Sequence, residues 1–186
     1  IIFVGAFHPW HGVKQIVKIA EKCKNDSVKA KFIMVGKGPL HDSISKEIHD
    51  KDLSEFMILT GSVPHSEVPS YIDASDISIA PFFIFDYTPL VKYGFWWCPV
   101  KLFEYLAMEA PVITIDAGDI PFISPHGKAG LLSAPDDFDE MYQNLIKLIE
   151  NKDLRVKLGK FGRKHVIKNY TWSRIANKIE NIYRDI

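Results

Sequence analysis

A regular alternation between short apolar runs and segments of helical periodicity is the feature that most constrains the fold of this chain. The apolar runs have the length and composition of buried β-strands, and glycine or proline stands at the ends of most of them. They span residues 1–4, 32–35, 57–59, 77–80 and 112–115, with a weaker sixth run at 130–133. Because such strands offer no polar face to solvent, we expect helices to cover both faces of their sheet, as in a parallel sheet.

Helical segments are predicted between and after these strands. Apolar residues in 13–23 recur at the i, i+3, i+4 spacing of one helix face, and those in 40–48 recur every four residues. From Asp136 onward the pattern is helical, and Thr171 or Ser173 is a candidate N-cap for the last segment. We therefore predict an α/β fold, in which a parallel sheet of about six strands lies between helix layers and a helical C-terminal tail follows.

Composition excludes several classes of protein. The formal net charge is zero, which argues against a general nucleic-acid binder or a basic membrane patch. No apolar run approaches the roughly 20 residues that a membrane span needs. Cys23 and Cys98 match no zinc spacing and are interpreted as free thiols of a reducing compartment. Because the chain begins directly in a strand, we expect residues 1–186 to form a single domain of a longer protein.

Ligands of open parallel sheets bind beyond the carboxyl ends of the strands, so the residues just after each strand are the most informative. The connection after the fourth strand, residues 82–97, is long and rich in aromatic residues, which favours a binding loop over a spacer. It leads into a proline, Pro99, followed by Lys101 and Glu104 at the start of a predicted helix. Proline is tolerated in the first turn of a helix, where its missing N–H is not needed.

The start of this helix has the chemistry of a nucleotide site. Free amides at a helix N-terminus attract anions, and Lys101 adds a positive charge suited to phosphate. The carboxylate of Glu104, one turn further on, could accept hydrogen bonds from the vicinal hydroxyls of a ribose. The alternative is that Lys101 and Glu104 form a solvated i, i+3 pair that only stabilises the helix end.

Several segments in order resemble the C-terminal, donor-binding domain of family 4 glycosyltransferases with the GT-B architecture. They are "FVGAFHPWHGV" (3–13), "FIMVGKGP" (32–39), "ILTGSVPHSEVPSYIDASDISIAPF" (58–82), "PVKLFEYLAMEAPVITIDAG" (99–118) and "GKAGLLSAPDD" (127–137). The resemblance implies a Rossmann-like domain that binds the nucleoside diphosphate of a sugar donor. A separate N-terminal domain would bind the acceptor, and transfer would usually proceed with retention of anomeric configuration and without a metal.

The resemblance also implies roles for individual residues. Glu104 matches the ribose ligand. Apart from the resemblance, Trp96 and Trp97 are candidates to stack on the donor sugar, and the alternative is that they pack under the loop. The turn Gly61, Ser62 and Val63 would pass against the nucleobase. The diphosphate site would comprise the first loop and the helix start, with residues His11, Gly12, Pro99, Val100, Lys101 and Leu102.

Three positions depart from the family pattern. The family often has an arginine and a lysine in the first loop, where this chain has Ala6 and His11. It also often has a glutamate at the position of Trp96. Sugar recognition and phosphate neutralisation are therefore expected to differ in detail. A histidine beside a diphosphate would start from a pKa near 6.5 and titrate as phosphate binds.

The resemblance further implies a nucleotide-sugar substrate, such as a UDP- or GDP-sugar, with no cofactor and no metal. The acceptor would be a glycan, a lipid-linked molecule or a small molecule held by the other domain. We expect a cytoplasmic protein that can lie on the inner face of the membrane through that domain. Two alternatives remain open, namely a sugar-nucleotide epimerase of similar fold and a non-catalytic nucleotide-binding module. A metal trio of His8, His11 and His65 is a further alternative to plain surface histidines.

Overall fold

The computed structural model describes residues 1–184, without the side chain of Asp86. Its centre is a six-stranded sheet with the order β3-β2-β1-β4-β5-β6, and every neighbouring pair is parallel. The strands are β1 (Ile2–Val4), β2 (Phe32–Val35), β3 (Met57–Gly61), β4 (Ser78–Ala80), β5 (Val112–Ile115) and β6 (Gly130–Ser133). The predicted parallel sheet is thus confirmed, and three of its strands have the predicted bounds.

The strand order reverses direction next to β1, and this reversal locates the site. β1 pairs with β2 on one side and with β4 on the other, through Ile2, which lies opposite both Ile33 and Ser78. The chain after β1 and the chain after β4 therefore lead to helices on opposite faces of the sheet, and we refer to the region at the carboxyl ends of these two strands as the crevice. Such a switch point is where ligands bind in open α/β sheets.

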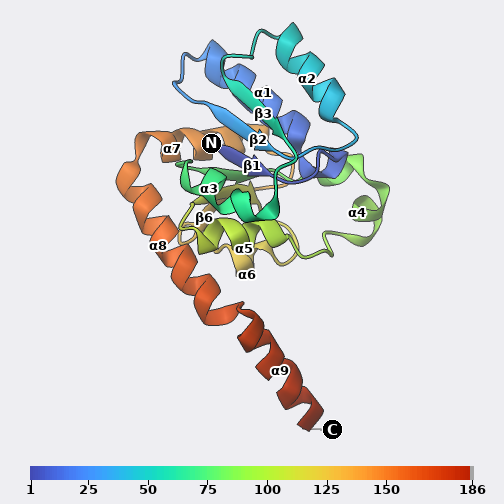
Figure 1. Cartoon of the computed structure of the whole chain (residues 1–186), viewed down its shortest axis with the longest axis vertical. Coiled ribbons are helices and arrows are strands. Elements are labelled where there is room, and N and C mark those ends of the chain that lie inside the picture. The colour runs from blue at the N-terminus through green and yellow to red at the C-terminus, as the bar shows by residue number, and fades with distance from the viewer. Residues whose placement is uncertain (185–186) are drawn as a thin grey trace.

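Helices cover both faces of the sheet (Figure 1). On one face lie α1 (Val13–Asn25) and α2 (His41–Asp50), and on the other α3 (Val68–Asp73) and α5 (Val100–Ala107). Shorter elements are η1 (Pro9–His11), η2 (His65–Glu67), η3 (Ile84–Asp86), α4 (Thr88–Tyr93) and α6 (Ile120–Ile123). The apolar stripe predicted for α1 is fully buried, from Val13 to Cys23. The apolar periodicity of α1 therefore correctly predicted the helix face that packs on the sheet.

The C-terminal tail is helical, as predicted, and it consists of three helices. These are α7 (Phe138–Glu150), α8 (Lys152–Asn169) and α9 (Trp172–Arg184). Of the two candidate caps of α9, Thr171 accepts a hydrogen bond from the Arg174 amide at 3.4 Å. α9 extends away from the body of the molecule, and none of its residues is buried (Figure 1). No helix within residues 1–184 is long and apolar enough to cross a membrane.

α8 packs closely against the C-terminal end of α5 because two of its residues lack side chains. A Cβ atom at Gly159 would lie 2.0 Å from the carbonyl oxygen of Glu109, and one at Gly162 would lie 2.7 Å from Leu106 Cδ2. Real Cβ atoms do not approach a backbone oxygen this closely, so glycine sets the separation of the two helices. α5 is thereby held at the end opposite to the predicted binding residues.

The aromatic connection after β4 is more regular than a loop. Residues 88–93 form the helix α4, although the whole connection was predicted to be a binding loop. Pro89 stands in the first turn of α4, and Gly94, with φ of 75°, ends it. Proline at the start of a helix and glycine just after its end are ordinary helix boundary signals. The helix was not predicted because the many aromatic residues in this segment favoured a binding loop.

Candidate functional site

The predicted residues converge at the crevice between β1 and β4. The loop after β1, the chain after β4 and the first turn of α5 approach one another here. A Cβ at Gly5 would lie 2.6 Å from Lys101 Nζ, and a Cβ at Gly12 would lie 2.7 Å from the side chain of Pro81. The structure therefore brings Lys101, at the start of α5, next to Gly5, the first glycine of the β1 loop.

Lys101 is the most unusual residue of this site. Its ammonium is buried and has no hydrogen-bond partner among the described residues. It lies 4.1 Å from the ring centroid of Phe3 and 5.4 Å from that of Phe82, so two aromatic faces contact the charge. Burial lowers the pKa of Lys101 to about 7, although the carboxylate of Glu104 opposes this effect. The interpretation of Lys101 and Glu104 as a solvated ion pair is therefore wrong.

Glu104 lies one turn along α5 and already has a partner. Its Oε1 is 2.9 Å from Nε2 of His65, and the Glu104 side chain is 30% exposed. His65 begins η2, directly after the turn that was assigned to the nucleobase. This contact was not predicted from the sequence, since the two residues are 39 positions apart. The only available signal was that both follow carboxyl ends of strands, which meet at one edge of the sheet.

The amides at the start of α5 are less free than the sequence suggested. The N–H of Val100 donates to the Cys98 carbonyl at 3.0 Å, and that of Leu102 donates to the Pro99 carbonyl at 2.9 Å. For the Lys101 amide, no backbone acceptor is recorded within the described part of the chain. The expectation of free amides at this helix start is corrected accordingly, because the turn at Pro99 satisfies those of Val100 and Leu102 internally.

His11 and Gly12 lie at the end of the β1 loop. His11 Nδ1 donates to the Ala6 carbonyl at 2.6 Å, which leaves Nε2 as the free ring nitrogen. Burial and the nearby Lys101 lower the pKa of His11 to about 4. The expected starting pKa near 6.5 is therefore wrong, and His11 is a neutral ring at pH 7. Gly12 adopts φ of 71° and N-caps α1, a conformation that favours glycine.

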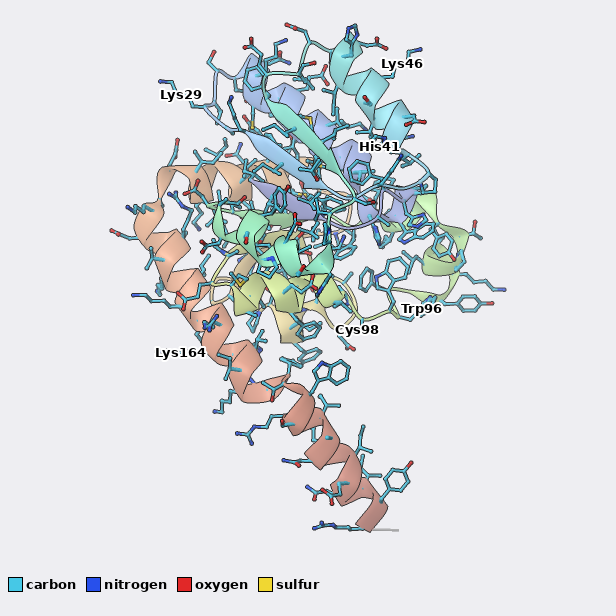
Figure 2. The ribbon with its side chains drawn as sticks, in the orientation of Figure 1. Lys29, His41, Lys46, Trp96, Cys98 and Lys164 are labelled. Atoms are coloured by element: carbon cyan, nitrogen blue, oxygen red, sulfur yellow. The ribbon has the colours of Figure 1, made fainter. Side chains whose placement is uncertain are left out.

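Aromatic side chains surround this crevice as a connected cluster. Trp10 stacks on His8 at a centroid distance of 4.3 Å and contacts Tyr87 at 4.4 Å. Trp97 lies among them, 5.0 Å from Phe95, and is partly buried. Trp96, in contrast, is 63% exposed (Figure 2). Of the two tryptophans assigned to the donor sugar, Trp97 thus packs within the cluster, whereas Trp96 is available to a ligand.

The turn assigned to the nucleobase is also partly engaged. The carbonyl of Gly61 accepts a hydrogen bond from the Gly36 amide at 2.9 Å. Ser62 is exposed, and Val63 packs partly against the core. The chain after β3 is therefore anchored to the end of β2, while the backbone around Ser62 faces solvent.

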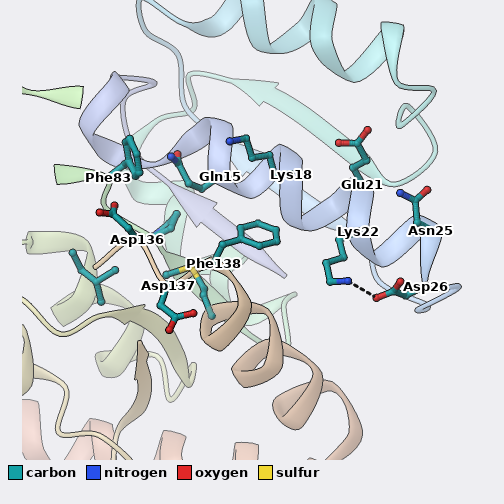
Figure 3. A pocket seen from close by; sticks show the side chains of 13 residues that line it. Gln15, Lys18, Glu21, Lys22, Asn25, Asp26, Phe83, Asp136, Asp137 and Phe138 are labelled. Atoms are coloured by element: carbon teal, nitrogen blue, oxygen red, sulfur yellow. Dashed lines mark ion pairs between the residues drawn. The ribbon is translucent and has the colours of Figure 1, made fainter. Parts of the chain in front are cut away.

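A pocket of about 590 Å³ lies apart from these residues, between α1 and the segment that begins α7. Figure 3 shows Lys18 of α1 on one side and Asp136 and Phe138 on the other. The Lys22–Asp26 ion pair, 3.2 Å long, lies along the same wall. None of the predicted donor residues lines this pocket. The predicted site is instead the crevice at Lys101 and Glu104.

No group of three metal-ligating side chains is found within residues 1–184. His8 and His11 lie 5.7 Å apart between ring centroids, but His65 is paired with Glu104 on a different loop. The alternative of a metal trio made by His8, His11 and His65 is therefore wrong.

Comparisons with known proteins agree with this architecture. The profile of the family described as "Glycosyl transferases group 1" matches residues 1–151. The alpha-D-kanosaminyltransferase of Streptomyces kanamyceticus is 21% identical over all 186 residues, which correspond to 45% of that relative. The chain spans less than half the length of the first curated relatives that it matches.

Solved structures share the fold. The crystal structure of Anabaena Alr3699/HepE in complex with UDP superposes with a TM-score of 0.83 at 16% identity, over 100% of this chain and 48% of that one. The C-terminal domain of the group 1 glycosyl transferase LpcC from Francisella tularensis gives a TM-score of 0.75 at 20% identity, over 92% and 85% of the two chains. With its profile matched over most of its length and its fold shared with these structures, the chain belongs to the glycosyl transferases group 1 family.

Proposed function

We propose that this chain is the donor-binding domain of a glycosyltransferase, and that it holds the nucleoside diphosphate of a UDP- or GDP-sugar at the crevice between β1 and β4. The longer protein would transfer the sugar to an acceptor bound by another domain. Retention of anomeric configuration and independence from metal belong to the same proposal. The single observation that carries it is the buried ammonium of Lys101, which has no hydrogen-bond partner within residues 1–184, with the carboxylate of Glu104 one turn away.

A diphosphate is the partner that Lys101 lacks. A buried charge without a counter-ion is costly, and a bound phosphate would relieve this cost through a charge-assisted interaction. The absence of a side chain at Gly5 lets an anion approach Lys101 from the β1 loop. Lys101 would therefore replace, from below the loop, the positive charge that the family often places at the positions of Ala6 and His11.

Glu104 is suited to the ribose. Its carboxylate has only acceptor sites, and two vicinal hydroxyls can donate to it together. In the free protein His65 occupies one carboxylate oxygen, so ribose would displace this imidazole or share the carboxylate with it. Trp96 is exposed at the end of the aromatic segment, and under this proposal its ring would stack on the sugar.

Names of relatives support the assignment of the donor. The Anabaena protein of the same fold is described in complex with UDP, and a Mycobacterium tuberculosis relative, 25% identical over 83% of this chain, is named a GDP-mannose-dependent mannosyltransferase. Both nucleotides therefore occur among proteins similar to this one, and both must be tested.

Calorimetric titration of UDP and GDP tests the proposal. We expect Glu104→Gln to weaken nucleotide binding by about 1–3 kcal/mol, the worth of a charge-assisted hydrogen bond. Lys101→Met should weaken binding of the diphosphate more than that of the nucleoside, because only the diphosphate carries the charge. Glu67→Gln and Lys128→Met, at exposed positions, are the matched controls. Unchanged affinities in both site variants would contradict the proposal.

Activity of the chain alone is the second test. The matched motifs belong to the donor side only, and a cleft with one wall can neither orient an acceptor nor exclude water. We therefore expect residues 1–186 to bind nucleotide without transferring sugar. Sugar transfer by this chain alone would contradict the division of labour proposed above.

A further inference from the structure

The outer face of α8 carries a row of lysines that the donor site does not use. Lys157, Lys160, Lys164 and Lys168 follow the i, i+3, i+7, i+11 spacing of one helix face, and we refer to them as the lysine stripe. All four are exposed, whereas Leu158, Gly159, Gly162 and Val166 form the buried face of the same helix. α8 as a whole contains seven lysines and arginines and one aspartate, although the net charge of the entire chain is zero.

The lysine stripe is not neutralised within the domain. No ion pair is recorded for its four members among residues 1–184, whereas Arg155 and Arg163 of the same helix pair with Asp76 and Glu109. Like charges at i, i+3 and i, i+4 repel and destabilise a helix. A surface that gathers such charges, while acidic residues are placed elsewhere, has the electrostatic character of a binding face for anions.

Apolar side chains accompany the lysines. Phe161 lies within the stripe and is 39% exposed, while Ile167 at 52% and Val156 at 45% flank it. Residues 157–168 of a helix extend over roughly 17 Å at 1.5 Å per residue, so the lysine stripe forms an extended face. Helices that lie on a lipid surface combine lysines with apolar side chains that enter the headgroup boundary, and the exposed side of α8 offers both kinds of side chain.

We propose that the lysine stripe of α8 binds the headgroups of anionic lipids and lays this domain on a membrane surface. The lysines match the negative charge of the surface, and Phe161 and Ile167 would enter the interface between headgroups and acyl chains, where a nucleic-acid backbone would offer them no apolar contact. Figure 2 places Lys164 on the side of the molecule opposite Trp96, so the crevice would stay accessible in the bound state. The inference is independent of which nucleotide the crevice binds.

Vesicle flotation tests this inference. We expect the 186-residue chain to bind vesicles of phosphatidylcholine with phosphatidylglycerol, and not vesicles of phosphatidylcholine alone. Replacing Lys160, Lys164 and Lys168 by glutamine should weaken binding about 100-fold, because each basic residue at an anionic surface contributes roughly a fivefold factor. The matched control replaces Lys14, Lys18 and Lys46, which are exposed on α1 and α2 and have no recorded ion pair among the described residues. It changes the net charge equally and should retain binding within a few fold.

Salt dependence and a second variant keep the test decisive if the triple variant folds poorly. Raised salt should release the unaltered chain from anionic vesicles, since the attraction is screened. Phe161→Ser should weaken binding at every salt concentration. Equal binding to neutral and anionic vesicles, an equal loss in the control variant, or retention by DNA without binding to vesicles would each overturn the proposal.

Discussion

Replacing Lys101 by methionine should make the folded domain more stable and its nucleotide binding weaker. Burial lowers the pKa of Lys101 from 10.5 to about 7. Each unit of pKa corresponds to about 1.4 kcal/mol, so burying the protonated ammonium costs about 5 kcal/mol of folding free energy. Methionine has a similar length and no charge, and it can fill the space between Phe3 and Phe82 without this cost.

The stabilisation by Lys101→Met should depend on pH in a defined direction. Below pH 7 both the folded and the unfolded chain hold the proton on Lys101, and the full cost applies. Between pH 7 and 10.5 the folded chain releases the proton while the unfolded chain keeps it, so the stability of the unaltered protein rises with pH. The advantage of the variant should therefore fall from about 5 kcal/mol near pH 6 to about 2 kcal/mol near pH 9.

Urea denaturation of both proteins across this pH range measures the difference directly. Lys128→Met, at an exposed lysine, is the control and should show no such pH dependence. If the difference in unfolding free energy stays constant from pH 6 to 9, or if the variant is less stable at pH 6, burial of the Lys101 ammonium does not cost folding free energy and the reasoning is refuted. Loss of UDP or GDP affinity in the stabilised variant would show that the charge is retained for binding.

Other parts of the site yield further predictions. Gly12→Ala should destabilise the domain by about 2–4 kcal/mol, because φ is 71° and the new Cβ would come 2.7 Å from the side chain of Pro81. The control Gly127→Ala, with φ of 69° and open space around it, should cost about 1 kcal/mol. Equal losses of stability in urea denaturation would exclude a clash at Gly12. His65→Ala should tighten nucleotide binding by up to about fivefold, since Glu104 then has no imidazole to release, and weaker binding in calorimetry would mean that His65 instead orients the carboxylate. Burial lowers the pKa of His11 to about 4, so the unfolded chain takes up the proton first and the folded domain should lose stability as pH falls from 6.5 to 4. In acid denaturation, His11→Ala should remove about 1–2 kcal/mol of this loss. An acid denaturation profile that does not change in the variant would contradict a buried neutral ring.

The sheet could be predicted from the sequence because its strands are buried on both faces. Runs such as Phe32–Val35 and Val112–Ile115 have no polar alternation, and their bounds match the structure. The helix α4 could not be recognised as easily, since its boundary residues are surrounded by aromatic side chains whose packing partners, such as Trp10, lie far away in sequence. Sequence patterns thus predict the periodicity of one element well, but they do not predict contacts between residues that are far apart in sequence.

The residues of the candidate site come together in the fold, but the chemistry of the site depends on contacts between elements. The spacing of Lys101 and Glu104 on one helix suggested an ion pair. In the structure, rings from β1 and from the chain after β4 enclose the lysine, and His65 takes the glutamate. None of these partners is close in sequence, so no spacing rule could indicate the burial of Lys101 or the lowered pKa of His11.

Because α8 is in close contact with one end of α5, a displacement at that end would be transmitted to the other end of α5. Its eight residues span about 12 Å, with Glu109 just beyond one end and Lys101 near the other. A methyl group at Gly159 would push against the backbone at Glu109, and a stiff helix converts such a push into a tilt that moves Lys101 and Glu104. Damage to the nucleotide crevice can therefore originate in the tail of the domain, at a residue that touches no ligand, and a screen for binding defects would recover α8 glycines together with crevice residues.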